Sequence, residues 1–428
     1  MTAYRLRGGL VVDPFLNIME EADLHVRDGI VVLPGSGPEP EEIVRIDGCW
    51  VVPRITDLHV HFRDPGQTWK EDWTSGARAA AAGGVTTVGV MPNTTPVVDS
   101  PEAVTDQRSR AGDRVRLWPI GALTLESAGR KAAPWDAMRE AGARAFSDDG
   151  RALYDSALMA AALSWSERTG VPVIQHLEDP ILSAGGVAHA GEAARLLGLS
   201  GQPAAAESVL AFRDVALAAE YGGRLHPAHC SVPGTLKALR WARGEGLRVT
   251  GEATPHHCLA NDAWLTRFGT DAVTKVNPPL RPEEARQAVR GALASGLLTV
   301  MASDHAPHGQ DEKGAPYATA PFGISGIETL VAAALTILVR DAGLSPLQAL
   351  APVTVGPHQV VGEAFSGLVP GAPADLTVID PAVTWTVDPA RFYSQGRNTP
   401  LAGVRLKGRV VATMVGGRFT FRDGEVLV

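Results

Sequence analysis

The chain has 428 residues, of which 45% are hydrophobic and 20% are charged, a balance typical of globular proteins that bury a substantial core. Its formal net charge of −8 argues against non-specific binding to nucleic acid or to an acidic membrane surface. Three cysteines are too few for a disulfide framework, and the N-terminal segment has no apolar core of signal-peptide length. The longest apolar run, 330–339, is far too short to cross a bilayer. We therefore expect a cytoplasmic protein with no nucleic-acid or membrane partner.

The two ends of the chain have the texture of β-structure. Near the N-terminus, Asp28-Gly29 separates two apolar runs, which is a strong signal for a β-hairpin. Past about residue 365 short β-type runs and turn residues return. Neither end is long enough to bury a core alone, so we expect residues 1–50 and 366–428 to combine into one small β-sandwich.

Between them, in residues 51–365, short apolar runs alternate with alanine-rich helical patterns. The stretch from Thr74 to Ala82, for example, predicts a helix that ends at Gly83-Gly84. Eight strands are expected: the run that carries His59, and 85–91, 115–120, 143–146, 171–176, 224–229, 249–253 and 298–302. Eight alternating strand–helix units predict an α/β fold of the closed (β/α)8 type, a TIM-like barrel, whose chemistry lies at the C-terminal ends of the strands.

Polar residues fall at those strand ends. His59 and His61 stand two residues apart, so on a strand their imidazoles point the same way, which suits a metal ion. Alone, this pair is equally compatible with structural histidines. Other runs end in the further candidates Asp148, Asp149, His176, His229 and Asp304. Four histidines and two carboxylates (Asp304 and one of the adjacent Asp148 and Asp149) on separate strands of one barrel together predict a pair of divalent metal ions with open positions for water.

The charges of such a centre have a chemical consequence. Two divalent ions, a bridging hydroxide and two carboxylates leave about one unit of positive charge, which would attract an anionic substrate and lower the pKa of the bridging water. The hydroxide could attack an amide carbonyl, and a neighbouring carboxylate could carry the proton to the leaving nitrogen. The pattern therefore favours hydrolysis or formation of an amide.

Longer motifs add a resemblance to a known family. They lie at residues 57–66, 91–94, 146–150, 254–257, 277–281, 303–308 and 320–323. With them the chain resembles the dihydroorotases of the amidohydrolase superfamily over nearly its whole length. That family catalyses the reversible, zinc-dependent cyclisation of N-carbamoyl-L-aspartate to (S)-dihydroorotate and water in pyrimidine (UMP) biosynthesis.

The resemblance implies a zinc centre with one or two Zn²⁺ ions per subunit, two being expected. His59 and His61 would hold the first ion, and His176 and His229 the second. Asp304 would be both a ligand of the first ion and the catalytic acid/base.

A carboxylated lysine bridges the two metals in many relatives, but the corresponding run here, 147–150, contains no lysine. It resembles the branch of the family in which an aspartate bridges. We take Asp149 as that bridge from its spacing to His176, and Asp148 remains the alternative.

The substrate's α-carboxylate needs a bidentate cationic partner. Arg63, two residues beyond His61, fits that need, and it lies on the same face if the strand continues. The family pattern implies a further substrate shell of His61, Asn93, Asn277 and His308, with backbone groups of Phe322 and Gly323. We expect the segment 309–320 to form a lid, and His256 and His257 to support the site, with metal ligation as an alternative role.

Two other interpretations remain open. A hydantoinase- or allantoinase-like cyclic amidase would share the fold, but such enzymes generally use the carboxylated lysine and lack an arginine placed like Arg63. A catalytically silent subunit that scaffolds an aspartate transcarbamoylase would have lost metal ligands, whereas this chain keeps all six positions. The resemblance implies a small-molecule substrate and leaves open a homodimer and an aspartate transcarbamoylase partner.

Overall fold

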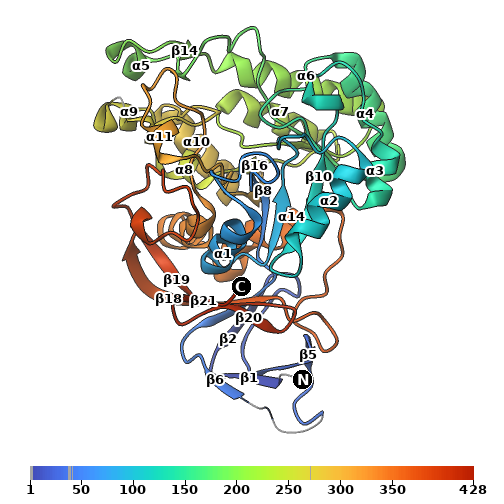
Figure 1. The fold of residues 1–428 in the computed structure, drawn as a ribbon, viewed down its shortest axis with the longest axis vertical. Coiled ribbons are helices and arrows are strands. Elements are labelled where there is room, and N and C mark those ends of the chain that lie inside the picture. The colour runs from blue at the N-terminus through green and yellow to red at the C-terminus, as the bar shows by residue number, and fades with distance from the viewer. Residues whose placement is uncertain (1–2, 37–39, 41, 270) are drawn as a thin grey trace.

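A parallel sheet forms the centre of the protein, for which a computed structural model describes residues 3–36, 40, 42–269 and 271–428 (Figure 1). Six strands are neighbours in chain order: β8 (Thr56–Val60), β9 (Thr87–Val90), β10 (Arg116–Gly121), β11 (Ala145–Phe146), β12 (Val173–Gln175) and β15 (Leu225–Pro227). Two more, β16 (Glu252–Ala253) and β17 (Val300–Met301), pair in parallel with each other. Each of the eight runs predicted to be strands therefore contains a strand.

Single bridges connect this pair to both edges of the six-stranded sheet. Leu225 of β15 bridges to Val249, just before β16, and Val60 of β8 bridges to His305, just after β17. Both bridges are parallel. The eight strands thus follow one another around the centre in the order in which they occur in the chain.

Helices follow the strands and cover the outside of the sheet (Figure 1). The longer ones are α1 (Trp73–Gly83), α2 (Pro101–Ala111), α3 (Trp135–Ala141), α4 (Ser156–Thr169), α6 (Ala205–Tyr221), α7 (Pro233–Gly244), α10 (Glu283–Ala294) and α14 (Val355–Val361). The short ones are α5 (Glu192–Leu196), α8 (Pro255–Leu259), α9 (Ala263–Phe268), α11 (Gln310–Lys313), α12 (Leu330–Ala334), which continues as a π-helix over Leu335–Asp341, and α13 (Pro346–Leu350). None of the helices in the described ranges is long and apolar enough to span a bilayer.

The boundaries of α1 follow from its sequence. The side chain of Asp72 accepts a hydrogen bond from the backbone N–H of Ser75, which caps the start of the helix. At its end Gly84 has a φ of 81°, a left-handed conformation that glycine adopts without strain. The helix predicted from Thr74 to Ala82 is confirmed.

The two ends of the chain share a second region. A seven-stranded sheet has the order β21 (Glu425–Val426), β20 (Arg418–Arg422), β19 (Arg405–Val415), β18 (Leu376–Thr386), β7 (Trp50–Pro53), β2 (Leu10–Asp13) and β3 (Ile18–Glu21). A four-stranded sheet has the order β5 (Ile30–Val32), β4 (Leu24–Arg27), β1 (Ala3–Arg7) and β6 (Glu42–Arg45). Two further short strands, β13 (Ala188–His189) and β14 (Gly201–Gln202), pair with each other in parallel.

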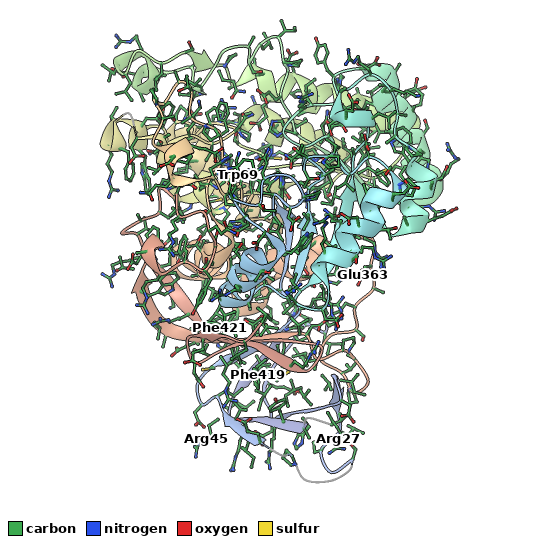
Figure 2. All side chains as sticks on the ribbon, viewed as in Figure 1. Arg27, Arg45, Trp69, Glu363, Phe419 and Phe421 are labelled. Atoms are coloured by element: carbon green, nitrogen blue, oxygen red, sulfur yellow. The ribbon has the colours of Figure 1, made fainter. Side chains whose placement is uncertain are left out.

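The N- and C-terminal strands meet within one sheet, at the lower end of the molecule in Figure 1. There β7 pairs antiparallel with β18, and Pro53 lies opposite Leu376. Side chains of both sheets form one buried apolar cluster. The ring of Phe419 (Figure 2) packs against this cluster and contacts the ring of Tyr4 on β1 at a centroid distance of 5.0 Å.

The predicted N-terminal hairpin is present. Strands β4 and β5 pair antiparallel, and Arg27 lies opposite Ile30. The two turn residues, Asp28 and Gly29, have φ values of 50° and 88°. Positive φ at both central residues is the geometry that an Asp-Gly dipeptide favours.

Candidate active site

The predicted metal-ligand residues come together at the C-terminal ends of the parallel strands. His59 is on β8, His61 is the first residue after β8, and Asp149 lies just past β11. His176 and His229 come after β12 and β15. Asp304 comes after β17, so all six predicted ligands lie at strand ends and all are buried.

Asp149 lies among the four histidines. Its Oδ1 is 3.3 Å from Nε2 of His59, 3.6 Å from Nδ1 of His176 and 3.8 Å from Nε2 of His229. Its Oδ2 is 3.5 Å from Nε2 of His61. Burial would raise the pKa of this carboxyl, but His59 and the hydrogen bonds of His176 and His229 lower it well below its usual value. One carboxylate therefore contacts ligands expected for both ions.

The neighbouring Asp148 points elsewhere. It accepts hydrogen bonds from the backbone N–H of Thr124 at 2.9 Å and from the hydroxyl of the same residue at 2.5 Å. Its carboxylate is therefore used in holding the loop around Thr124. Of the two candidates for the bridging position, Asp149 is the one beside the histidines.

Two groups of ligand atoms are close enough to hold a metal ion, and they share His59. One consists of His59, His61 and Asp304, and the other of His59, Asp149 and His229. In the described part of the chain, the buried atoms Nε2 of His59 and Oδ1 of Asp149 have no hydrogen-bond partner. Because unpaired buried polar atoms are costly, and imidazole and carboxylate are ligands that Zn²⁺ accepts, these residues fit a metal centre.

His176 lies at the edge of this cluster. Its Nδ1 is 2.9 Å from Nε2 of His229, the two rings are nearly perpendicular, and His176 belongs to neither of the two groups of ligand atoms. Its Nε2–H donates to Glu178 at 2.9 Å, and Glu178 also accepts from the side-chain amide of Asn277 at 2.8 Å. Glu178 therefore fixes the orientation of a predicted metal ligand and of a predicted substrate residue. This role of Glu178 was not predicted from the sequence.

Three site residues have left-handed backbone conformations. The φ values are 59° for Arg63, 31° for His229 and 47° for Asp304. Such conformations cost non-glycine residues roughly 1–3 kcal/mol each and cluster at functional sites. The fold therefore holds these side chains in positions that a relaxed backbone would not give them.

Glu252, at the start of β16, contacts both His59 and the backbone of His229. Its Oε1 accepts from Nδ1–H of His59 at 2.7 Å and from the backbone N–H of His229 at 3.1 Å. Its Oε2 accepts from Nε2–H of His226 at 3.3 Å. A carboxylate on the outer nitrogen of a histidine turns the other nitrogen toward the metal and makes it a better ligand. Glu252, too, was not among the predicted site residues.

We expect Glu252→Gln to weaken metal binding by about 10- to 100-fold, because the charge that orients His59 is lost. The measurement is zinc affinity by titration against a chromophoric chelator. Glu245→Gln, at an exposed position after α7, is the control and should bind zinc as the parent does. Equal zinc affinities for the two variants would refute the role of Glu252.

Arg63 lies beside the cluster, but not for the reason predicted. β8 ends at Val60 and Arg63 has a positive φ, so the expectation that the strand continues through Arg63 is wrong. The turn after β8 instead directs the guanidinium toward Pro307 and His308. There its Nε donates to the carbonyl of Pro307 at 3.3 Å, and Nη2 is 3.4 Å from Nε2 of His308.

The guanidinium of Arg63 has no carboxylate partner within ion-pair distance among the described residues. Burial lowers its pKa to about 10, against the opposing charges of Asp304 and Asp149, so it stays protonated at neutral pH. A largely buried, unpaired cation next to a metal centre is suited to binding a carboxylate of a substrate.

The other predicted substrate residues surround the same space. His308 donates from Nε2–H to the carbonyl of Phe322 at 2.7 Å, and burial lowers its pKa to about 2, so its ring is neutral. Asn93 accepts from Nδ1–H of His61 at 2.8 Å and donates to the backbone carbonyl of Asp149 at 3.3 Å. Asn93 thus orients His61 as well as bordering the site.

A cavity of about 1060 Å³ lies next to this cluster and gives a small molecule room to enter. Its wall includes Gly150, Glu178, Lys275 and Phe322. These residues directly adjoin the predicted metal and substrate residues. The cavity therefore borders the site.

Of the two histidines predicted to support the site, His257 has both ring nitrogens engaged. Nδ1 accepts from the hydroxyl of Thr254 at 2.7 Å, and Nε2–H donates to the carbonyl of Pro278 at 2.9 Å. It therefore fixes the loop that carries Asn277. His256 has a buried Nε2 with no hydrogen-bond partner in the described ranges, and burial lowers its pKa to about 4.

Comparisons with known proteins agree with this geometry. A model of the Dihydro-orotase-like family matches residues 48–233, and one of the Amidohydrolase family matches residues 188–421. A dihydroorotase of Pelotomaculum thermopropionicum is 45% identical over 421 residues, which is 98% of each chain. One of Anaeromyxobacter dehalogenans strain 2CP-1 is 44% identical over 426 residues, again 98% of each chain.

Solved structures with the same fold include hydantoinases. The L-hydantoinase (dihydropyrimidinase) of Arthrobacter aurescens superposes with a TM-score of 0.88 at 25% identity, over 100% of this chain and 98% of that one. The dihydropyrimidinase of Brevibacillus agri superposes with a TM-score of 0.85 at 21% identity, over 100% and 96%. The second likeness concerns the fold alone.

Proposed function

Because the chain belongs to the dihydroorotase family of amidohydrolases, we propose that it catalyses the reversible cyclisation of N-carbamoyl-L-aspartate to (S)-dihydroorotate and water in pyrimidine biosynthesis. The observation that carries this proposal is the guanidinium of Arg63, largely buried beside the histidine and aspartate cluster without a carboxylate partner among the described residues. Both the open-chain and the cyclic substrate carry the carboxylate that such a group would bind. We place the enzyme in the cytoplasm.

The proposal includes the finer architecture. The eight parallel strands would close into a (β/α)8 barrel formed by residues 51–365. Residues 1–50 and 366–428 would form the accompanying β-sandwich. The bridges at both edges of the six-stranded sheet and the pairing of β7 with β18 support this division.

We further propose two Zn²⁺ ions as cofactors. His59, His61 and Asp304 would hold one ion, His176 and His229 the other, and Asp149 would lie between them. The ions would supply Lewis acidity at the amide carbonyl and make a water molecule more acidic. The unpaired buried atoms of His59 and Asp149 support this assignment.

Asp304 would carry the proton. Its Oδ1 lies 3.3 Å from Nε2 of His61 and 3.6 Å from Nε2 of His59. Burial opposes ionisation, but the hydrogen bond with His61 and the charges of His59 and His229 lower the pKa of the carboxyl, so it is ionised and can accept a proton. In hydrolysis it would take the proton of the attacking water and pass it to the leaving nitrogen; in cyclisation the direction reverses.

The substrate would be held by its carboxylate and its amide edges. Arg63 would bind the α-carboxylate, next to His308 and the backbone of Phe322 and Gly323. Asn277, oriented by Glu178, would offer its side-chain oxygen, since its amide N–H donates to Glu178. His61 and Asn93 would border the reacting end.

The likeness to a hydantoinase structure supports a second candidate, a related cyclic amidase with another ring as substrate. The test measures kcat/KM of the zinc-loaded chain for dihydroorotate, hydantoin and allantoin. We expect clear preference for dihydroorotate, because Arg63 would pair with a carboxylate that hydantoin and allantoin lack.

Preference for hydantoin or allantoin would contradict the proposal and favour the second candidate. A chain that binds no zinc and turns over none of the three would instead be a scaffold, for instance for an aspartate transcarbamoylase. Measuring the isolated chain also tests whether activity needs such a partner.

A further inference from the structure

Two buried lysines hold the backbone of the segment 309–323, which includes the stretch expected from its composition to be a lid. Lys313, the last residue of α11, is only 6% exposed. Its Nζ donates to the carbonyls of Pro321 and Gly323 at 3.0 Å each, and lies 3.4 Å from the carbonyl of Lys275. Its ammonium group forms no ion pair within the described residues, so backbone oxygens are its partners.

The second lysine, Lys275, connects this segment to another loop of the site. Lys275 is 2% exposed, and its Nζ donates to the carbonyls of Tyr317 at 2.7 Å and Ala318 at 3.0 Å. The same ammonium lies 4.6 Å from the centre of the Phe322 ring, a cation–π contact. The backbone N–H of Gly323 also donates to the carbonyl of Lys275 at 3.0 Å. Lys275 thus binds the backbone of the segment that carries Lys313, whereas Lys313 binds mainly its own segment and approaches the carbonyl of Lys275.

The residues held in this way surround the proposed substrate site. Pro321 and Gly323 flank Phe322, whose carbonyl accepts from His308. Lys275 is two residues before Asn277. The two lysines therefore hold together two loops that approach the proposed substrate site from different parts of the chain: Lys275 connects the loops, and Lys313 fixes the shape of one of them.

The energetics favour a positioning role over simple burial. An ammonium group loses hydration when it is buried, and burial lowers the pKa of Lys313 to about 7. A methionine would fill the same space without this cost. A buried lysine whose donors all end on backbone carbonyls of these two loops is explained if the position of the loops matters.

We propose that Lys313 and Lys275 form a clasp that positions the substrate-binding loops, so that the segment 309–323 is held in place as part of the site. This inference rests on the proposed function, because its kinetic readout is the binding of dihydroorotate. The two lysines are positioning residues and act through the backbone of Phe322 and Gly323. Their hydrogen bonds go to none of the residues assigned to the metal ions.

The test replaces Lys313 with methionine, which keeps much of the length of the side chain and removes its three N–H donors. We expect KM for dihydroorotate to rise by roughly tenfold or more, with kcat changed by less than about threefold, because binding is lost equally from ground state and transition state. Zinc content should stay at the parent's value. Amide hydrogen exchange in residues 317–323 should become faster.

Two further variants separate positioning from bulk stability. Lys313→Arg keeps a cation with several donors and should restore part of the lost affinity. In Lys275→Met/Lys313→Met the increase in KM should be smaller than the product of the two single effects, because either substitution opens the same clasp. Lys237→Met, on the exposed side of α7, is the matched control and should behave as the parent.

Unchanged KM and unchanged amide hydrogen exchange in Lys313→Met would overturn the proposal. It would also be overturned if the increases in KM multiplied in the double variant, or if Lys313→Met lost zinc together with kcat. If Lys313→Met does not fold, Lys275→Met carries the same expectations. If the parent does not convert dihydroorotate, the proposed function fails. The exchange comparison would then still decide whether the clasp holds the loop.

Discussion

Asp304→Asn is expected to lower kcat for dihydroorotate hydrolysis by about 10²- to 10⁴-fold while leaving the fold intact. The asparagine side chain has nearly the same shape and keeps one oxygen toward His59 and His61, but it cannot accept and return a proton. Asp304 is buried and its Oδ1 lies within 3.6 Å of both histidines, so a base from the surface cannot readily take its place. Steady-state kinetics at saturating substrate measure the effect.

Zinc content and thermal unfolding must be measured on the same preparations. Zinc at the parent's value assigns the loss to proton transfer, whereas loss of zinc assigns it to ligation. Asp113→Asn, an exposed carboxylate remote from the site, is the matched control and should keep full activity. Near-normal turnover by Asp304→Asn would remove Asp304 from the proposed chemistry.

Arg63→Ala should weaken substrate binding by about 2–5 kcal/mol, because the substrate's carboxylate would be left buried without its partner. Calorimetry with dihydroorotate at a pH where turnover is slow gives the dissociation constant directly. Arg63→Lys should recover only part of the affinity, since an ammonium cannot form two parallel hydrogen bonds to one carboxylate.

Arg240→Ala provides the comparison, since Arg240 is exposed on α7. It changes the net charge equally and should bind dihydroorotate as the parent does. An unchanged dissociation constant for Arg63→Ala would place the substrate carboxylate elsewhere in the cavity. The preference for dihydroorotate over hydantoin would then need another explanation.

Much of the fold follows from local pattern. Buried parallel strands are continuous apolar runs, and the eight runs identified in the sequence each contain a strand. The hairpin at Asp28-Gly29 and the helix boundary at Gly84 depend on backbone preferences of single residues, so they too are predictable. The lengths of the strands are less predictable, because an apolar run can begin before the first paired residue: β11 and β16 cover only the last two residues of their runs.

The sequence pointed to residues whose place follows from their position along a strand, and the structure brings two of these, His59 and Asp149, together. Residues whose contacts depend on a partner from another strand were not predicted. Glu252 lies in a run predicted to be a strand, so a carboxylate inside an otherwise uncharged run was a signal of a buried, paired charge. Its contacts with His59 and His229 come from β8 and from the residues after β15, and they are visible only in three dimensions.

The role of Arg63 toward the substrate stays a prediction. It relied on strand alternation, but the backbone turns to a positive φ there. A single sequence does not reveal a strained conformation at a non-glycine residue, since local preferences oppose it. The contacts of Lys275 and Lys313 could not be predicted either, because their acceptors are backbone carbonyls, which every residue type carries.

The pairing of β7 with β18 affects how the protein is made. On the ribosome, β7 emerges early, yet its partner near Leu376 is synthesised only after the whole central sheet. Until then, β7 has an unpaired edge that is open to association with other chains. Completion of the terminal region is therefore a late step, and chains shortened before β18 would retain that open edge and tend to aggregate.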